Sequence, residues 1–446
     1  MGTYWQAQNN GSADNIRLLT RDATWLAWND HEPDDEAPNS KRIPGCRTAV
    51  NDALQSALHS TNVVILLGSG ASFCAKNSSS QNAPGMADLW HGVRAGLPDN
   101  TRSTAEALFD RIALRILGKL PNVGQAGDIE SLLSLCKMSI ELLKARFPAS
   151  PGAETPKELE ELTDFVKSAE AKILRMVSFV GNETDLRAHT GFLQKFARRS
   201  ADKPRVKLFT TNYDLCLETA AMRRGITLVD GFSHSLPQRF NRDHYHYDIV
   251  RRTPLGTKAD FLEGVFQLYK LHGSVDWRRR EDSVVVRSLD TPDDSLVPVL
   301  IYPRSTKYQE AFETPYLDMF SALQAALREP DTTLIISGFG FADDHISAPI
   351  WAAIEANLTL RLILCDCAFI PEIELESAEH SIPAAADGQR PVQAKLMHLV
   401  QQGDSRISIL NGRFEDLADA MPMMAGKTDR QLLQDRLERV RIEGAA

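Results

Sequence analysis

Three short polar segments each follow an apolar run of the chain. Residues 68–72 read Gly-Ser-Gly-Ala-Ser, residues 210–214 read Thr-Thr-Asn-Tyr-Asp, and residues 271–274 read Leu-His-Gly-Ser. The amide of Asn212 both donates and accepts hydrogen bonds, so it can hold a hydroxyl group and a water together. The imidazole of His272 titrates near neutral pH and can take a proton from a hydroxyl group. Together these side chains suit chemistry at the ribose of a bound nucleotide.

Both side chains also have a structural interpretation. An Asn that follows a strand commonly caps the next helix, and Asp214 is a second candidate for that cap. A His in a tight turn beside Gly273 commonly bonds the backbone. The sequence leaves these alternatives open, and the functional interpretation depends on the segments occurring together in this order.

The first segment is a candidate phosphate-binding loop. Gly68 and Gly70 would let the backbone approach a pyrophosphate, and the N–H groups that begin the following helix favour an anion. Phe73 stands where the ordinary dinucleotide fingerprint has its third glycine. A tight turn without a ligand therefore remains the alternative.

A fourth segment, residues 337–346, reads Ser-Gly-Phe-Gly-Phe-Ala-Asp-Asp-His-Ile. An apolar run that ends in Gly-x-Gly before an acidic helix start is typical of the second loop of a nucleotide site. Asp343 or Asp344 would either contact the adenosine ribose or cap the helix, and the sequence does not decide between these roles.

Strands must place these segments at one edge of a sheet. Apolar, β-branched runs alternate with helical patterns, which predicts an α/β fold with a Rossmann-like, doubly wound, mainly parallel sheet. Residues 89–200 are helical in pattern and predict an inserted helical module, broken by the Pro/Gly-rich stretch 148–156. The predicted strands are residues 62–67, 206–209, 266–271, 297–301, 334–337, 362–364 and 407–410.

The chain divides into three predicted parts. Residues 1–48 are polar and form an N-terminal extension that packs on the domain or on a neighbouring subunit. Residues 49–420 form the catalytic domain with its helical insertion. Residues 421–446 form a C-terminal helix with an apolar stripe that docks on the body or on a partner.

Composition excludes several classes of protein. The net charge is -9 and the charged fraction is 24%, which argues against broad nucleic-acid binding because phosphate contacts need clustered Lys and Arg. Residues 278–280 are a local basic patch, expected in a solvated turn or an intersubunit contact.

No apolar run approaches the roughly 18–20 residues of a membrane span. The N-terminus lacks a signal-peptide core, so we expect a cytoplasmic protein with reduced cysteines. The cysteines form no pair of CxxC motifs, so we expect no zinc site.

The four segments in this order resemble the NAD site of sirtuins, and still more that of the sirtuin-like NAD hydrolases of bacterial anti-phage defence. The resemblance covers about residues 49–420. It implies that NAD+ is the substrate, that Asn212 holds the nicotinamide ribose and orients the attacking water, and that His272 accepts a proton from a ribose hydroxyl. It also implies that residues 83–86 belong to a loop covering the nucleotide. The residues implied to contact NAD+ are Gly68, Ser69, Gly70, Ala71, Ser72, Thr211, Asp214, Gly273, Ser274, Gly338, Phe339, Gly340 and Asp343.

The resemblance favours a hydrolase over a protein deacylase. Deacylases of the family carry a zinc ribbon built from two cysteine pairs, and this sequence has none. Water would then capture the ribose, giving nicotinamide and ADP-ribose. The alternatives are a subunit that binds NAD or ADP-ribose without catalysis and, less favoured, a deacylase; a nuclease role lacks a supporting carboxylate motif.

Partners are implied by the resemblance alone. It suggests an NAD-depleting effector that forms a homo-oligomer and pairs with a HerA-like ATPase. The alternative partner is a short Argonaute or another defence sensor. We expect no direct contact with nucleic acid or a membrane. Residues 302–304 (Tyr-Pro-Arg), with Lys307 and Tyr308, also recur in such chains and either line the site or support the fold.

Overall fold

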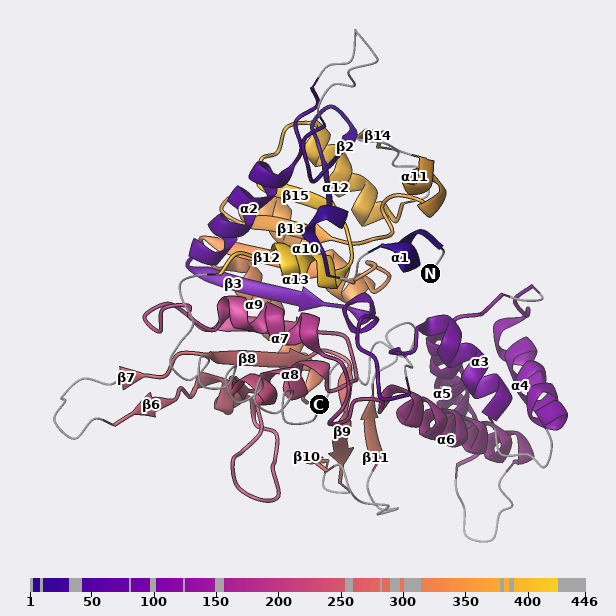
Figure 1. Ribbon diagram of the computed structural model, residues 1–446. Helices are drawn as coiled ribbons and strands as arrows, with labels where there is room; N and C mark the ends of the chain where they lie inside the picture. The colour runs from indigo at the N-terminus through magenta and orange to yellow at the C-terminus, as the bar shows by residue number, and fades with distance from the viewer. Residues whose placement is uncertain are drawn as a thin grey trace, which may run out of the picture.

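The computed structural model describes residues 3–8, 11–31, 42–79, 82–96, 102–122, 125–148, 156–252, 260–280, 283–288, 297–300, 314–377, 381–384 and 389–423. A ten-stranded sheet crosses the described part of the chain in the order β14-β2-β1-β15-β13-β12-β3-β4-β8-β5 (Figure 1). Its strands are β1 (Arg17–Leu19), β2 (Thr24–Ala27), β3 (Asn62–Leu67), β4 (Val206–Thr210), β5 (Thr227–Val229), β8 (Val265–Lys270), β12 (Thr332–Ser337), β13 (Arg361–Cys365), β14 (Ser381–Pro383) and β15 (Ile407–Asn411).

The strands from β15 to β5 all pair in parallel, whereas β1, β2 and β14 add an antiparallel edge. Every residue of β3 and β12 is buried. Continuous apolar runs of this kind are typical of parallel strands that are covered on both faces. The predicted α/β, mainly parallel, doubly wound fold is confirmed.

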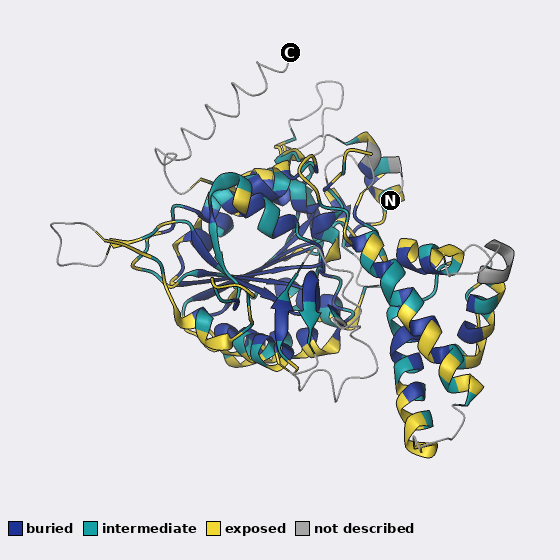
Figure 2. Cartoon of the chain, turned by 90° about the horizontal axis from the view of Figure 1, so that it is seen from below, coloured by how far each residue is buried: buried dark blue, intermediate teal, exposed yellow. Residues whose placement is uncertain are grey.

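Helices cover both faces of the sheet, and side chains alternate between two cores (Figure 2). Val64 and Leu66 of β3 pack in one core with α9 (Tyr316–Arg328), α10 (Asp344–Ala356) and α12 (Pro391–Gln401). Ile65 and Leu67 face the other core. That second core is made with α2 (Arg47–His59), α7 (Arg187–Phe196), α8 (Cys216–Arg224) and α13 (Phe414–Ala420).

Four helices form a separate module beside the sheet, as Figures 1 and 2 both show. They are α3 (Met86–Gly96), α4 (Arg102–Leu117), α5 (Ile129–Arg146) and α6 (Lys157–Val177), and they share their own apolar core. Tyr213 and Val275 of the sheet domain insert into that core. α7 lies inside the predicted range 89–200, but it packs against α8 and α13 on the sheet. The helical module therefore extends from Met86 to Val177.

Part of the predicted N-terminal extension enters the sheet. β1 pairs antiparallel with β15, with Arg17 opposite Asn411. Before it lie α1 (Thr3–Ala7) and η1 (Ala13–Asn15). The backbone N–H of Tyr4 donates to Glu372 of α11 (Glu372–Ser377) at 3.1 Å. The predicted C-terminal helix lies outside the described residues.

A small antiparallel sheet follows His272 and contains β9 (Gly273–Arg279), β10 (Val285–Arg287) and β11 (Val297–Leu300). The predicted strand at 297–301 belongs to this sheet and not to the parallel one. The expected solvated turn at 278–280 is wrong, because Arg278 and Arg279 lie in β9. The Arg278 guanidinium donates to the carbonyls of Val275 and Trp277. A ribbon of β6 (Val250–Arg251) and β7 (Asp260–Phe261) and the short helix η3 (Arg242–His246) complete this region.

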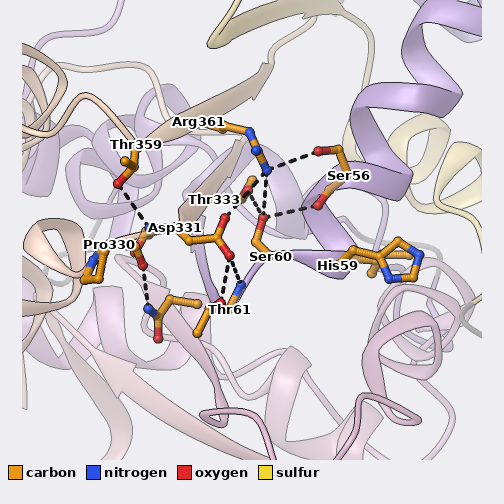
Figure 3. Close-up of polar contacts among 12 residues, drawn as sticks. Ser56, His59, Ser60, Thr61, Pro330, Asp331, Thr333, Thr359 and Arg361 are labelled. Atoms are coloured by element: carbon orange, nitrogen blue, oxygen red, sulfur yellow. Dashed lines mark hydrogen bonds and ion pairs between the residues drawn. The ribbon is translucent and has the colours of Figure 1, made fainter.

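Polar contacts hold the amino ends of β3, β12 and β13 together (Figure 3). Asp331 accepts hydrogen bonds from the backbone and the hydroxyl of Thr61, at 2.8 and 2.7 Å. The hydroxyls of Ser60 and Thr333 lie 2.6 Å apart, and Arg361 donates to Ser56 at 3.1 Å. These contacts fix the end of the sheet opposite to the predicted site.

Candidate functional site

The predicted site residues meet where the strand order reverses. From β3 the chain continues to β4 and β8 on one side of the sheet and to β12 and β13 on the other. A crevice at the carboxyl ends of the strands beside such a reversal is the usual ligand site of an open α/β sheet. Here the loops after β3, β4, β8 and β12 surround a cavity of about 300 Å³.

The cavity brings together most of the predicted residues. Its walls include Ser69, Ser72, Thr211, Asn212, Asp214, His272, Gly338, Phe339, Gly340 and Asp343. Gly68, Gly70 and Ala71 lie in the first loop, and Gly273 and Ser274 begin β9, but none of the five lines the cavity. Ala83, Pro84 and Met86 also line the cavity, as expected for a covering segment. Residues 302–304, 307 and 308 lie outside the described part of the chain.

The Asn212 amide uses its donor group in two hydrogen bonds, while its acceptor oxygen has none within the described part of the chain. Its Nδ2 donates to the Gly68 carbonyl at 2.9 Å and to Ser72 Oγ at 2.8 Å. Its Oδ1 is buried and has no hydrogen-bond partner among the described residues. A buried acceptor without a partner costs stability, so it suits a hydroxyl or water supplied by a ligand.

The helix-cap interpretation of Asn212 is wrong, because the N-cap residue of α8 is Leu215 and the side chain that bonds the first helical N–H is that of Asp214. Asp214 Oδ1 accepts from the backbone N–H of Cys216 at 2.9 Å, at the start of α8. Its Oδ2 accepts from Ser72 Oγ at 2.7 Å. Ser72 therefore links Asp214 to Asn212 and fixes the amide in one orientation.

His272 is buried and pairs with Asp343, its Nε2 lying 3.1 Å from Asp343 Oδ2. Asp343 Oδ1 also accepts from the backbone N–H of His345 at 2.8 Å, so Asp343 caps α10. Burial acts to raise the pKa of Asp343, but the hydrogen bonds and positive charge of His272 and His345 outweigh it and lower that pKa. The helix-cap role is confirmed, and the proposed contact with adenosine ribose stays a prediction.

The glycines of the first and second loops pack against each other. The N–H groups of Gly68 and Gly70 donate to the carbonyls of Ser337 and Gly338, both at 3.0 Å. A Cβ on Gly68 would lie 2.4 Å from the Gly338 carbonyl oxygen. Gly338 has a φ of +63°, and a Cβ there would lie 2.3 Å from the Ala71 nitrogen. The glycines thus allow two backbones to touch, and their contact with pyrophosphate stays a prediction.

The helical module supplies a wall residue that the sequence analysis did not single out. Ile129 and Leu132 of α5 are buried in the module core, but Glu130 lines the cavity. The Tyr213 hydroxyl donates to Glu130 Oε1 at 3.3 Å. Burial raises the pKa of Glu130 to about 7; the charge of His272 opposes this increase. A lone acidic residue within the apolar start of α5 was the available signal.

Arg390, at the amino end of α12, is a second residue that the sequence analysis missed. Its side chain lines the cavity beside Gly340. A guanidinium in this place suits an anionic ligand group such as a phosphate. No motif marks Arg390 in the sequence, because a single Arg before Pro391 has no distinctive context.

A larger cavity of about 550 Å³ lies on the other side of the first loop. Phe73 and Cys74 face it, and its charged lining includes Lys195 and Glu415. It contains none of the predicted catalytic residues, so we place the site in the smaller cavity.

Within the described ranges, no three His, Cys, Asp or Glu side chains group as metal ligands, and the expectation of no zinc stays a prediction. None of the described helices combines the length and the apolar character that a membrane span requires.

Part of the chain matches a known protein family. Residues 206–381 match the SIR2-like domain family. Asn212, His272 and the loop from Gly338 to Asp343 lie within the matched residues. No curated protein sequence matches the chain significantly.

Two solved structures of Sir2 homologues bound to ADP-ribose are also similar to this chain. One is a His-to-Asn variant with a TM-score of 0.35 and 12% identity, covering 87% of this chain and 98% of that one. The other is a Ser-to-Ala variant with a TM-score of 0.32 and 14% identity, covering 79% of this chain and 94% of that one. At these TM-scores, the assignment of the domain depends on the family match and on the site itself.

Proposed function

We propose that this protein hydrolyses NAD+ to nicotinamide and ADP-ribose. The observation that carries the proposal is that Asn212, whose Oδ1 is buried and unpartnered among the described residues, lines the same cavity as His272. The match of residues 206–381 to the SIR2-like domain family supports a nucleotide of the NAD class as ligand.

In this proposal, Asn212 orients the nucleophile. Its Nδ2 is occupied by Gly68 and Ser72, so only the acceptor Oδ1 is available to bind a water or a ribose hydroxyl. A water held there is positioned for attack on the ribose carbon that carries nicotinamide. Holding a reactant in this way replaces a bimolecular step with a local one.

His272 acts at the ribose hydroxyl. Asp343 engages Nε2 and so fixes the ring orientation and tautomer, as a carboxylate does for a catalytic His. Proton transfer from the ribose hydroxyl to His272 increases electron density on the sugar, which supports the positive charge that develops as the bond to nicotinamide breaks.

The bond changes balance without any further reactant. The C1′–N1 bond breaks and its electron pair neutralises the pyridinium nitrogen, so nicotinamide leaves as a neutral molecule. The C1′–O bond then forms with water, which loses one proton, and His272 returns its own proton to the ribose oxygen. Arg390, which lines the cavity, would hold the pyrophosphate.

For the biological role, we propose an NAD-depleting effector of an anti-phage defence complex in the cytoplasm. The proposed assembly is a homo-oligomer with a HerA-like ATPase as partner, or a short Argonaute or another sensor in its place. These proposals are supported by the order of the four sequence segments and by the SIR2-like domain match. Loss of cellular NAD would be lethal, so the activity must be controlled by that assembly.

The proposal is tested by using chromatography to measure the release of nicotinamide from NAD+. The purified protein is assayed alone and together with the product of its genomic neighbour. Asn212→Ala and His272→Ala should each abolish release. Asn182→Ala and His234→Ala change exposed side chains of the same types and should leave it unchanged. Bound NAD+ without nicotinamide release in either preparation would instead support a non-catalytic binding subunit.

A further inference from the structure

We propose that Glu130 of the helical module is the general base that takes the proton of the attacking water. This inference rests on the proposed hydrolysis of NAD+ and names a residue outside the four segments of the sequence analysis. It assigns the helical module a direct part in the reaction, because the module supplies an acid–base group to a site otherwise built from the sheet.

The position of Glu130 carries the argument. It is the second residue of α5, and it lines the same 300 Å³ cavity as Asn212 and His272. The Tyr213 hydroxyl donates to it at 3.3 Å. Tyr213 directly follows Asn212 in the chain, so one short segment holds both the residue that orients the water and the partner of the proposed base.

Packing does not require a carboxyl group at this position. Ile129 and Leu132 make the contacts to the module core and are fully buried. Glu130 is half-buried, and among the described residues no Lys or Arg forms an ion pair with it. A carboxyl removed from water without a cation costs free energy of folding, which is typical of a residue kept for chemistry.

The groups that face Glu130 come from every element around it. Asp128 of the same helix start and Asp343 at the start of α10 raise its pKa; His272 and the Tyr213 hydroxyl lower it. Burial is the largest effect, and the resulting pKa is about 7. A base with this pKa is ionised in part at neutral pH and accepts a proton readily, which is the optimum for general-base catalysis.

The two bases have separate tasks. The Nε2 of His272 is engaged by Asp343, and its ring serves the ribose hydroxyl. Glu130 takes the second proton, which the water loses as its oxygen bonds to C1′. The carboxylate becomes a carboxylic acid and returns the proton to solvent when ADP-ribose leaves.

The decisive variant is Glu130→Gln, which keeps the shape of the side chain and removes the base. We expect kcat for nicotinamide release to fall roughly 10²–10⁴-fold, with the Kd of NAD+ from calorimetry changed less than about twofold. In the wild-type protein, kcat should rise with pH through about 7. Glu160→Gln, at an exposed position of the same module, should match the wild type.

Tyr213→Phe tests the contact itself. Its hydroxyl lowers the pKa of Glu130, so its loss should move the rise of kcat to higher pH. Activity should then be reduced at pH 7 and approach the wild-type value near pH 9.

Each other outcome is informative. An active Glu130→Gln protein would overturn the inference and leave NAD+ hydrolysis standing. A variant with kcat lost and Kd raised tenfold or more would make Glu130 a binding residue, which also overturns it. A wild-type protein that binds NAD+ but releases no nicotinamide would refute the proposed function, and the role of Glu130 with it.

Discussion

His272 Nε2 and Asp343 Oδ2 lie 3.1 Å apart and join the turn after β8 to the start of α10. Asp343 has a second contact, because its Oδ1 accepts from the N–H of His345. A helix cap thus also orients the imidazole. This carboxylate connects the turn after β8 with the loop after β12, in addition to the backbone contacts of Gly68 and Gly70 with that loop.

Two substitutions separate the tasks of Asp343. Asp343→Asn keeps an oxygen for the cap and loses the charged partner of His272, so kcat should fall roughly 10–100-fold with KM and Tm little changed. Asp343→Ala should lose the cap as well, at about 1 kcal/mol of stability. Steady-state kinetics and thermal unfolding measure both effects; an unchanged kcat in Asp343→Asn would exclude the orienting role.

Ser72 should matter through Asn212 and not through packing. Ser72→Ala removes an acceptor from Asn212 Nδ2 and a donor to Asp214 Oδ2. The amide then keeps only the Gly68 carbonyl, and we expect kcat to fall roughly tenfold, equivalent to about 1.4 kcal/mol in the barrier. Ser235→Ala, at an exposed position, is the matched control. If Ser72→Ala retained full kcat, the orientation of Asn212 would not depend on this link.

Gly338 should tolerate no side chain. Gly338→Ala places a Cβ 2.3 Å from the Ala71 nitrogen at a φ of +63°, and we expect a loss of about 3 kcal/mol of stability. Gly340→Ala meets only the Arg390 side chain, at 3.7 Å, and should cost less than about 1 kcal/mol. Urea denaturation compares the two. Equal stability of the variants would contradict the described packing of the loops.

Glu130 should reduce stability at alkaline pH. Its pKa in the folded protein, about 7, exceeds the ordinary value of 4.5, so the folded state binds this proton more tightly than the unfolded state does. Stability from this group is present at low pH and lost as pH rises from about 4.5 through 7. Glu130→Gln should therefore raise Tm by roughly 2–5 °C at pH 8 and by less at pH 5. A larger gain at pH 5 would reverse the inferred sign.

The sequence predicted the parts of the site that follow local rules. Strands β3, β4, β8 and β12 are apolar runs with polar residues after them, and parallel strands place those residues at one edge. The positions of Asn212 and His272 in one cavity follow from that rule. The partner of His272 does not, because Asp343 read equally well as a ribose ligand or as a cap.

The sequence did not predict the contacts between segments that lie far apart along the chain. Glu130 reaches the cavity only because Tyr213 docks into the helical module, and no local pattern encodes that docking. The strands β1 and β2 have three and four residues. Such short strands depend on their partners more than on their own propensity. β1 and β2 pair with each other, and their outer partners, β15 and β14, lie far along the chain.

The pairing of β1 with β15 has a consequence for the newly made protein. Arg17 lies opposite Asn411, so β1 is synthesised well before β15 and can complete its pairing only when that strand is available. Long-range pairing of this kind is slow to form and comes late in folding. The edge of the sheet is thus closed only after β3, β4, β8 and β12 have been synthesised. A truncated chain that stopped before β15 would leave β1 paired with β2 alone, and its open edge would be exposed to quality control in the cell.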